Sequence, residues 1–144
     1  MNVRELLKTK GDRLVTNRPE DTLEAAAQLL TQNNIGALPV RNAQGELVGM
    51  ISERDIVRRV AEMGAKALLL RVGDAMTRDV STCTPADSVK SVMDTMRRRH
   101  IRHVPVVDNG TLVGIISQRD VLHSLLEQTQ LEINVLRDVL IAKG

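Results

Sequence analysis

Two stretches with the same pattern carry the side chains best suited to bind a ligand. GMISERD runs from Gly49 to Asp55, and GIISQRD runs from Gly114 to Asp120. Each copy reads glycine, two apolar residues, serine, a variable residue, arginine and aspartate. A serine hydroxyl at a helix start can bind phosphate, and Arg54 or Arg119 can add positive charge beside it. The duplication predicts either two ligand sites or two copies of one structural device.

The same spacing also matches a helix N-cap. Ser52 and Asp55 have the Ser-x-x-acid spacing of a capping box, in which side chains bond backbone N–H groups that the helix leaves unpaired. The pair Ser117 and Asp120 repeats this spacing. A cap requires neither the preceding glycine nor the arginine, whereas a binding site explains both, because a glycine leaves room for a flat ligand against the strand. The residues alone leave both interpretations open.

The hydrophobic pattern places both stretches at the same point of a repeated unit. Each half predicts a strand, a helix, two strands and a second helix, in that order. A unit of about 60 residues buries too little surface to be stable alone. We therefore expect an α+β fold in which two β-α-β-β-α units pack face to face, residues 1–70 forming the first and 71–144 the second. The predicted elements are strands 14–16, 37–41 and 46–52 with helices 21–33 and 53–64, then a strand near Val80, strands 103–107 and 111–117, and helices 86–99 and from 118 onward.

The strand before each stretch is repeated as well. NNIGALPV ends at Val40 and RHIRHVPV ends at Val106, and the Asn109-Gly110 pair indicates a hairpin turn between the next two strands. Taken together, the two copies resemble a pair of CBS domains, the Bateman module, from about Val3 to Leu126, with no attached enzyme or channel. The resemblance implies a flat, pseudo-twofold disc with two clefts that bind adenine nucleotides and regulate another protein.

The resemblance also assigns roles to single residues. It implies that Asp55 and Asp120 accept hydrogen bonds from ribose hydroxyls. A basic pair before the strand proline contacts phosphates in the family; the second half has Arg102 and His103 there, whereas the first half has the uncharged Gly36-Ala37. We expect the first-half segment to line an adenine slot instead. The predicted nucleotide-binding residues are Thr16, Ile35, Gly36, Ala37, Ser52, Arg54, Asp55, Thr82, Arg102, His103, Pro105, Ser117, Arg119 and Asp120.

Composition argues against several other functions. The chain of 144 residues contains no Phe, Tyr or Trp, which excludes base stacking on aromatic side chains. With 20 basic and 18 acidic residues the net charge is only +2, so nucleic-acid binding through the basic run 97–103 is a weak alternative. Cys83, His100 and His103 are too few ligands for a closed zinc site. The sequence shows neither a glycine-rich phosphate loop nor a histidine near Ser52, and we expect no metal, no catalytic cofactor and no enzymatic activity.

The C-terminal part carries a heptad pattern. Apolar or small residues alternate four and three positions apart, which buries one stripe of a helix against another helix. That helix belongs either to the same domain or to a second copy of the chain, and we favour a homodimer. The stripe consists of Leu122, Leu126, Thr129, Ile133, Leu136 and Leu140.

The start of the chain is charged and lacks the apolar stretch of a secretory signal, and no apolar run approaches the roughly 20 residues that span a bilayer. We therefore expect a cytoplasmic protein with no membrane contact. The sequence predicts a regulatory module that binds AMP, ADP, ATP or NAD between its repeats and signals through a change in shape or in an unidentified partner protein. The alternative is a structural dimerisation module that binds no ligand and uses the two repeated stretches as caps.

Overall fold

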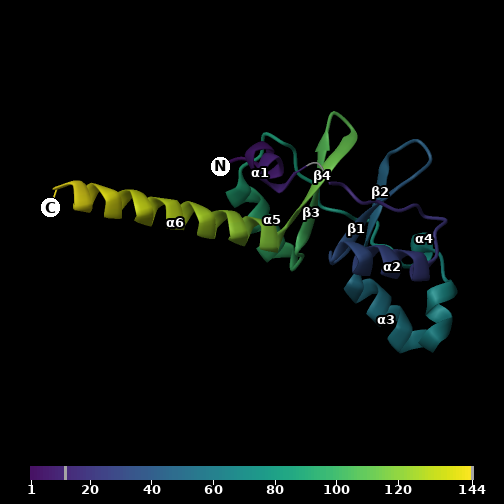
Figure 1. Ribbon diagram of the computed structural model, residues 1–144. Helices are drawn as coiled ribbons and strands as arrows, with labels where there is room; N and C mark the ends of the chain where they lie inside the picture. Colours follow the sequence, from purple (N-terminus) through teal and green to yellow (C-terminus); the bar gives the residue numbers. More distant parts are fainter. Residues whose placement is uncertain (12, 144) are drawn as a thin grey trace.

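The computed structural model describes residues 1–11 and 13–143 and contains two helix-and-hairpin units side by side (Figure 1). Its order of elements confirms the α+β fold with two tandem units and a long C-terminal helix. In chain order the elements are α1 (Val3–Lys10), α2 (Leu23–Asn33), β1 (Ala37–Arg41), β2 (Leu47–Ser52), α3 (Glu53–Met63), the 3₁₀ helix η1 (Gly64–Leu69), α4 (Val72–Ala75), α5 (Val89–Arg99), β3 (His103–Asp108), β4 (Thr111–Ser117) and α6 (Gln118–Lys143).

The strand predicted at the start of each unit is shortened to a single bridge. Asn17 pairs in parallel with Val40, and Cys83 pairs in parallel with Val106. Extending either ladder toward the preceding residues would require a backbone N–H from Pro39 or Pro105, which proline lacks. The prediction of regular strands at 14–16 and near residue 80 was therefore wrong. Both segments are extended and run beside the hairpins, but each forms only one bridge.

The helices α2 and α5 begin later than predicted because capping residues precede them. The Thr22 hydroxyl accepts a hydrogen bond from the Ala25 N–H at 3.1 Å, and the Ser88 hydroxyl accepts one from the Ser91 N–H at 3.0 Å. A residue that caps in this way has extended backbone and lies outside the helix. The hairpin turn at Asn109 is confirmed, since Asp108 pairs with Thr111 across it.

Two apolar clusters form the core, and each contains a segment from the opposite half of the chain. Val3 and Leu6 of α1 are buried in the cluster of the second unit, and the Val3 N–H donates to the Asp87 carbonyl at 2.9 Å. Val72 of α4 is buried in the cluster of the first unit. We call α1 and residues 72–77 the crossing segments. The domain boundary at residue 70 remains a prediction. The crossing segments lie on one side of this boundary in the sequence and pack against the unit on the other side.

The repeated glycines make room for these crossing segments. A β-carbon on Gly49 would lie 2.9 Å from the Thr77 carbonyl oxygen and 2.6 Å from the Met76 sulfur. A β-carbon on Gly114 would lie 2.7 Å from a methyl group of Leu7. The expectation that these glycines leave space for a ligand was wrong, because the space is filled by protein.

The two glycines should differ in their tolerance of alanine. Gly49→Ala should destabilise the fold by about 1–3 kcal/mol, because the Thr77 backbone is fixed by hydrogen bonds of 2.8 and 2.9 Å to Met50 and cannot easily move. Gly114→Ala should cost less than about 1 kcal/mol, since only the end of the Leu7 side chain must shift. Urea unfolding followed by far-ultraviolet circular dichroism measures both values. Equal losses would contradict this account.

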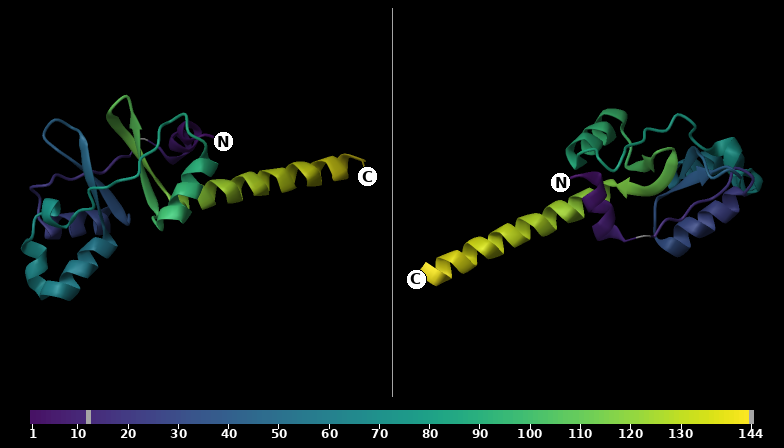
Figure 2. Two further views of the ribbon diagram at one scale, coloured as in Figure 1. Left: turned by 180° about the vertical axis from the view of Figure 1, so that it is seen from behind. Right: turned by 90° about the horizontal axis from the view of Figure 1, so that it is seen from above.

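Helix α6 leaves the body of the protein as a single long rod (Figures 1 and 2). Val121, in its first turn, is its buried residue, whereas Leu126 and Leu140 on the heptad stripe are 70% and 71% exposed. The alternative in which the stripe folds back on its own domain is therefore wrong. Within residues 1–11 and 13–143, no helix combines the length and apolar character needed to cross a membrane.

Candidate functional site

Both repeated stretches form the predicted helix caps. The Ser52 N–H donates to Oδ2 of Asp55 at 2.9 Å, and the Ser52 hydroxyl accepts from the Asp55 N–H at 3.2 Å. The Ser117 N–H donates to Oδ2 of Asp120 at 2.9 Å, and its hydroxyl accepts from the Asp120 N–H at 3.0 Å. The prediction that the two repeated stretches cap helices is therefore correct.

The caps leave half of each carboxylate available. The bonds to the capping serines reach Oδ2 of Asp55 and of Asp120, and no hydrogen bond from the described residues reaches Oδ1 of either side chain. A carboxylate can accept about four hydrogen bonds in all. Capping and ligand binding are thus compatible functions of the same residue.

Each aspartate lies at the edge of a cleft between the two units. The hairpin registers place Ser52 opposite Ala37 and Ser117 opposite His103, so each repeated stretch lies beside the start of the neighbouring strand. The Asp120 cleft has a volume of about 980 Å³ and the Asp55 cleft about 510 Å³. Both volumes fall in the range of small-molecule sites.

The two clefts collect most of the predicted nucleotide-binding residues. Gly36, Ala37, Arg102 and His103 line both clefts. The Asp120 cleft adds Ile35, Ser117, Arg119 and Asp120, and the Asp55 cleft adds Ser52, Arg54 and Asp55.

Three predicted residues line neither cleft. Pro105 is buried in β3, and Thr16 and Thr82 lie in the extended segments before the bridges. Their neighbours Val15 and Ser81 line the clefts instead. Successive side chains of an extended segment point to opposite sides, so choosing the adjacent residue selects the wrong face.

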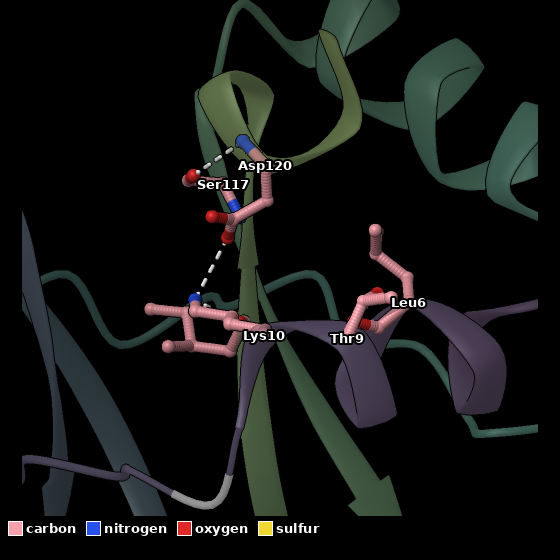
Figure 3. A network of polar contacts seen from close by, with 6 residues as sticks. Leu6, Thr9, Lys10, Ser117 and Asp120 are labelled. Atoms are coloured by element: carbon pink, nitrogen blue, oxygen red, sulfur yellow. Dashed lines mark hydrogen bonds and ion pairs between the residues drawn. The ribbon is translucent and has the colours of Figure 1, made fainter. Parts of the chain in front are cut away.

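Sequence reasoning missed two cations of the Asp120 cleft, Lys10 and Arg13. Nζ of Lys10 lies 2.7 Å from Oδ2 of Asp120 and donates to the Ile115 carbonyl oxygen at 2.6 Å. Figure 3 shows the contact between Lys10 and Asp120. The sequence shows that the start of the chain is basic, but it does not show which of these residues lie in the cleft. Their place in the cleft follows from the packing of α1 on the second unit.

Charge in the Asp120 cleft is set by these contacts. Burial opposes ionisation of Asp120, but hydrogen bonds from Lys10 and from the Ser117 N–H outweigh it and hold the pKa of the carboxyl below its usual range. Burial, aided by Lys10 and Arg102, lowers the pKa of His103. His103 is therefore a neutral imidazole at neutral pH, and Arg102 alone supplies the positive charge of the predicted basic pair.

The other reactive groups are poorly placed for chemistry. Burial, with a smaller effect from Asp87, raises the pKa of the Cys83 thiol to about 12, so it stays protonated and weakly nucleophilic. In the described parts of the chain, no three His, Cys, Asp or Glu side chains lie close enough together to hold a metal ion.

The sequence and the fold match a known family. Residues 3–62 and 72–127 match the model of the CBS domain. The chain belongs to the CBS-domain family. Its two matched units form a CBS pair.

Several relatives of this CBS pair are well matched. A mitochondrial CBS domain-containing protein of Arabidopsis thaliana is 34% identical over 81% of the chain, and the chain spans 59% of that relative's length. The crystal structure of a CBS-domain containing protein from Agrobacterium tumefaciens is 40% identical, covers 85% of this chain and 91% of its own, and has a TM-score of 0.81. The crystal structure of a CBS domain pair in complex with methylthioadenosine and S-adenosyl-L-methionine is 28% identical. It covers 89% of this chain and 98% of its own, and has a TM-score of 0.79.

Proposed function

We propose that this CBS pair is a sensor that binds an adenine nucleotide (AMP, ADP, ATP or NAD) in the clefts between its units. The observation that carries the proposal is the arrangement of Asp55 and Asp120. Each lines a cleft, and its Oδ2 is held by the helix cap while no described residue bonds its Oδ1. A carboxylate held in this way is oriented before the ligand arrives, which reduces the entropy lost on binding.

The clefts offer complementary contacts for each part of a nucleotide. Oδ1 of the aspartate accepts from the ribose hydroxyls, and Arg102 with Arg119 binds phosphate at the Asp120 cleft. Since the chain has no aromatic residues, adenine lies between aliphatic side chains, for which Val15 and Ile35 are placed in this cleft. No catalytic step and no catalytic cofactor form part of the proposal.

The segment between the clefts provides a route for signalling. Gly36 and His103 line both clefts, and a β-carbon on Gly36 would lie only 3.3 Å from Cε1 of His103. A ligand that moves His103 in one cleft therefore changes the wall of the other. We propose that occupancy alters the packing of the two units and thereby the binding of a regulated protein.

The test of ligand binding is a thermal-unfolding panel. A ligand that binds only the folded state stabilises it by about 2.7 kcal/mol when present at about 100 times its Kd. We expect AMP, ADP, ATP or NAD to raise the Tm measured by circular dichroism, and the matching guanine nucleotides to raise it less. Absence of any shift with every adenine compound at millimolar concentration would favour the alternative, a structural dimerisation module without a ligand.

We also propose that the chain forms a homodimer through α6. The exposed heptad stripe needs a partner, and a second α6 offers the same stripe. In a parallel pair the heptad register brings Glu132, at a g position, beside Arg137 of the second copy, at an e position, so the flanking charges are complementary.

A further inference from the structure

The two crossing segments donate different groups to corresponding backbone carbonyl oxygens of β2 and β4. Met50 and Ile115 each follow the glycine of a repeated stretch and therefore correspond. In the first unit the Met50 carbonyl oxygen accepts the Thr77 backbone N–H at 2.8 Å. In the second unit the Ile115 carbonyl oxygen accepts a bond from Nζ of Lys10 at 2.6 Å. A lysine side chain thus takes the place of a backbone amide.

This exchange puts a positive charge beside only one of the two aspartates. Nζ of Lys10 bonds Oδ2 of Asp120 at 2.7 Å, and the two side chains are 28% and 23% exposed. Asp55 has its capping partner Ser52, and no cation among the described residues forms a salt bridge with it. Figure 3 shows Lys10 reaching from the end of α1 toward the start of α6.

Lys10 is held where it is by the packing of α1. Val3 and Leu6 are buried in the second core cluster, and Leu7 lies against Gly114. The ammonium group therefore does not have to be recruited from solvent when a ligand enters. A charge that is already in position binds a ligand anion at a smaller entropic cost.

The remaining charged residues increase the difference between the clefts. The lining of the Asp120 cleft carries four Lys and Arg side chains and two acidic ones, whereas that of the Asp55 cleft carries three of each. One cation of the Asp55 cleft, Arg99, is already paired with Asp79 at 2.9 Å. The charged side chains of the Asp120 cleft are Lys10, Arg13, Arg102, Arg119, Glu53 and Asp120, and those of the Asp55 cleft are Arg54, Arg99, Arg102, Glu53, Asp55 and Asp79.

We propose that Lys10 is a specificity-determining residue, which makes the Asp120 cleft select polyphosphate nucleotides over uncharged adenosine. The Asp55 cleft, which lacks an equivalent cation, binds adenosine ligands with little regard to their phosphates. This inference rests on the proposed function. Oδ1 of Asp120 remains available to the ribose while Lys10 holds Oδ2, and the ammonium group attracts the phosphates that the ribose carries. For adenosine the same ammonium group only weakens Asp120 as an acceptor.

The test measures each cleft separately. Calorimetric titration with ATP and with adenosine is performed on Lys10→Met in an Asp55→Asn background, which leaves the Asp120 cleft intact, and in an Asp120→Asn background, which leaves the Asp55 cleft intact. In the first background we expect ATP to bind about tenfold more weakly, adenosine to change less than about twofold, and the ATP effect to shrink as salt screens the charge. In the second background neither affinity should change.

Three further variants separate charge from structure. Lys8→Met is the matched control, because Lys8 is exposed on the same helix and lines neither cleft. Lys10→Gln can still donate to the Ile115 carbonyl oxygen without carrying a charge, so it should reproduce the selective loss of ATP affinity even if Lys10→Met folds poorly. Lys10→Arg should retain most of the preference for ATP.

The possible results distinguish this inference from the proposed function. Equal losses for ATP and adenosine, or a loss of the same size in the Asp120→Asn background, would show a structural role for Lys10 and overturn the inference alone. Unchanged ATP affinity in both Lys10→Met and Lys10→Gln would do the same. A parent protein that binds neither ligand overturns the proposed function, and the inference with it.

Discussion

Asp120→Asn is expected to weaken ATP binding about tenfold to hundredfold while costing only about 1 kcal/mol of folding stability. Loss of a charged partner in a hydrogen bond commonly costs ~1.5–3 kcal/mol, which corresponds to a roughly tenfold to hundredfold increase in Kd. The cap survives, because an asparagine oxygen can still accept from the Ser117 N–H. The stability loss comes mainly from the ion pair with Lys10, whose members are 28% and 23% exposed. Calorimetric titration and urea unfolding measure the two effects.

Asp55→Asn provides the matched comparison. Its cap has the same geometry but no lysine, so its stability cost should be smaller than that of Asp120→Asn. The structural alternative expects no change in ligand binding from either variant. If both variants keep the parent affinity for ATP in both clefts and remain folded, the assignment of the aspartates to the ribose is refuted.

The effect of Asp120→Asn on stability should also depend on pH. The pKa of Asp120 is lowered in the folded protein, so its contribution to stability is present above the unfolded carboxyl pKa of about 3.9 and is lost as pH falls through the lower folded pKa. Asp120→Asn should remove this part of the acid sensitivity. Comparison of the urea midpoints of parent and variant at neutral and acid pH should show the gap between them closing in acid.

Truncation after Gln128 is expected to convert a dimer into a monomer while leaving the fold intact. The removed part of α6 carries exposed apolar residues of the stripe, including Leu136 at 64% and Leu140 at 71% exposed. Burying one such side chain contributes about 1.5–3 kcal/mol, so the loss of four of the six stripe residues should abolish association. The described residues beyond 128 are all exposed, and their removal should leave the Tm of the body nearly unchanged. Light scattering gives the mass.

Single substitutions sharpen this test. Leu136 lies on the stripe and Leu131 on the opposite side of α6, and both are 64% exposed in one chain. Leu136→Asp should dissociate the dimer and Leu131→Asp should not. For a parallel arrangement, Glu132→Arg should weaken association and a second change, Arg137→Glu, should restore it. A monomeric parent, or a dimer that survives the truncation, would contradict the role of α6.

Local features of this protein could be predicted from its sequence. The hairpin strands, the Asn109 turn and the caps at Ser52 and Ser117 were correct, because each depends on residues within a few positions of one another. The repeat added a second copy of each signal, which was enough to predict the tandem units and the resemblance to CBS domains. Gly36 and Asp120, predicted from the two halves, do line one cleft.

Features that depend on distant contacts were decided by the tertiary structure. Lys10 and Asp120 are 110 positions apart, and only the packing of α1 on the second unit brings them together. The same crossing explains why Gly49 and Gly114 contact protein where a ligand was expected. A pattern within one stretch shows which groups are present, but the space beside a glycine and the partner of a charge are set by whichever segment folds against them.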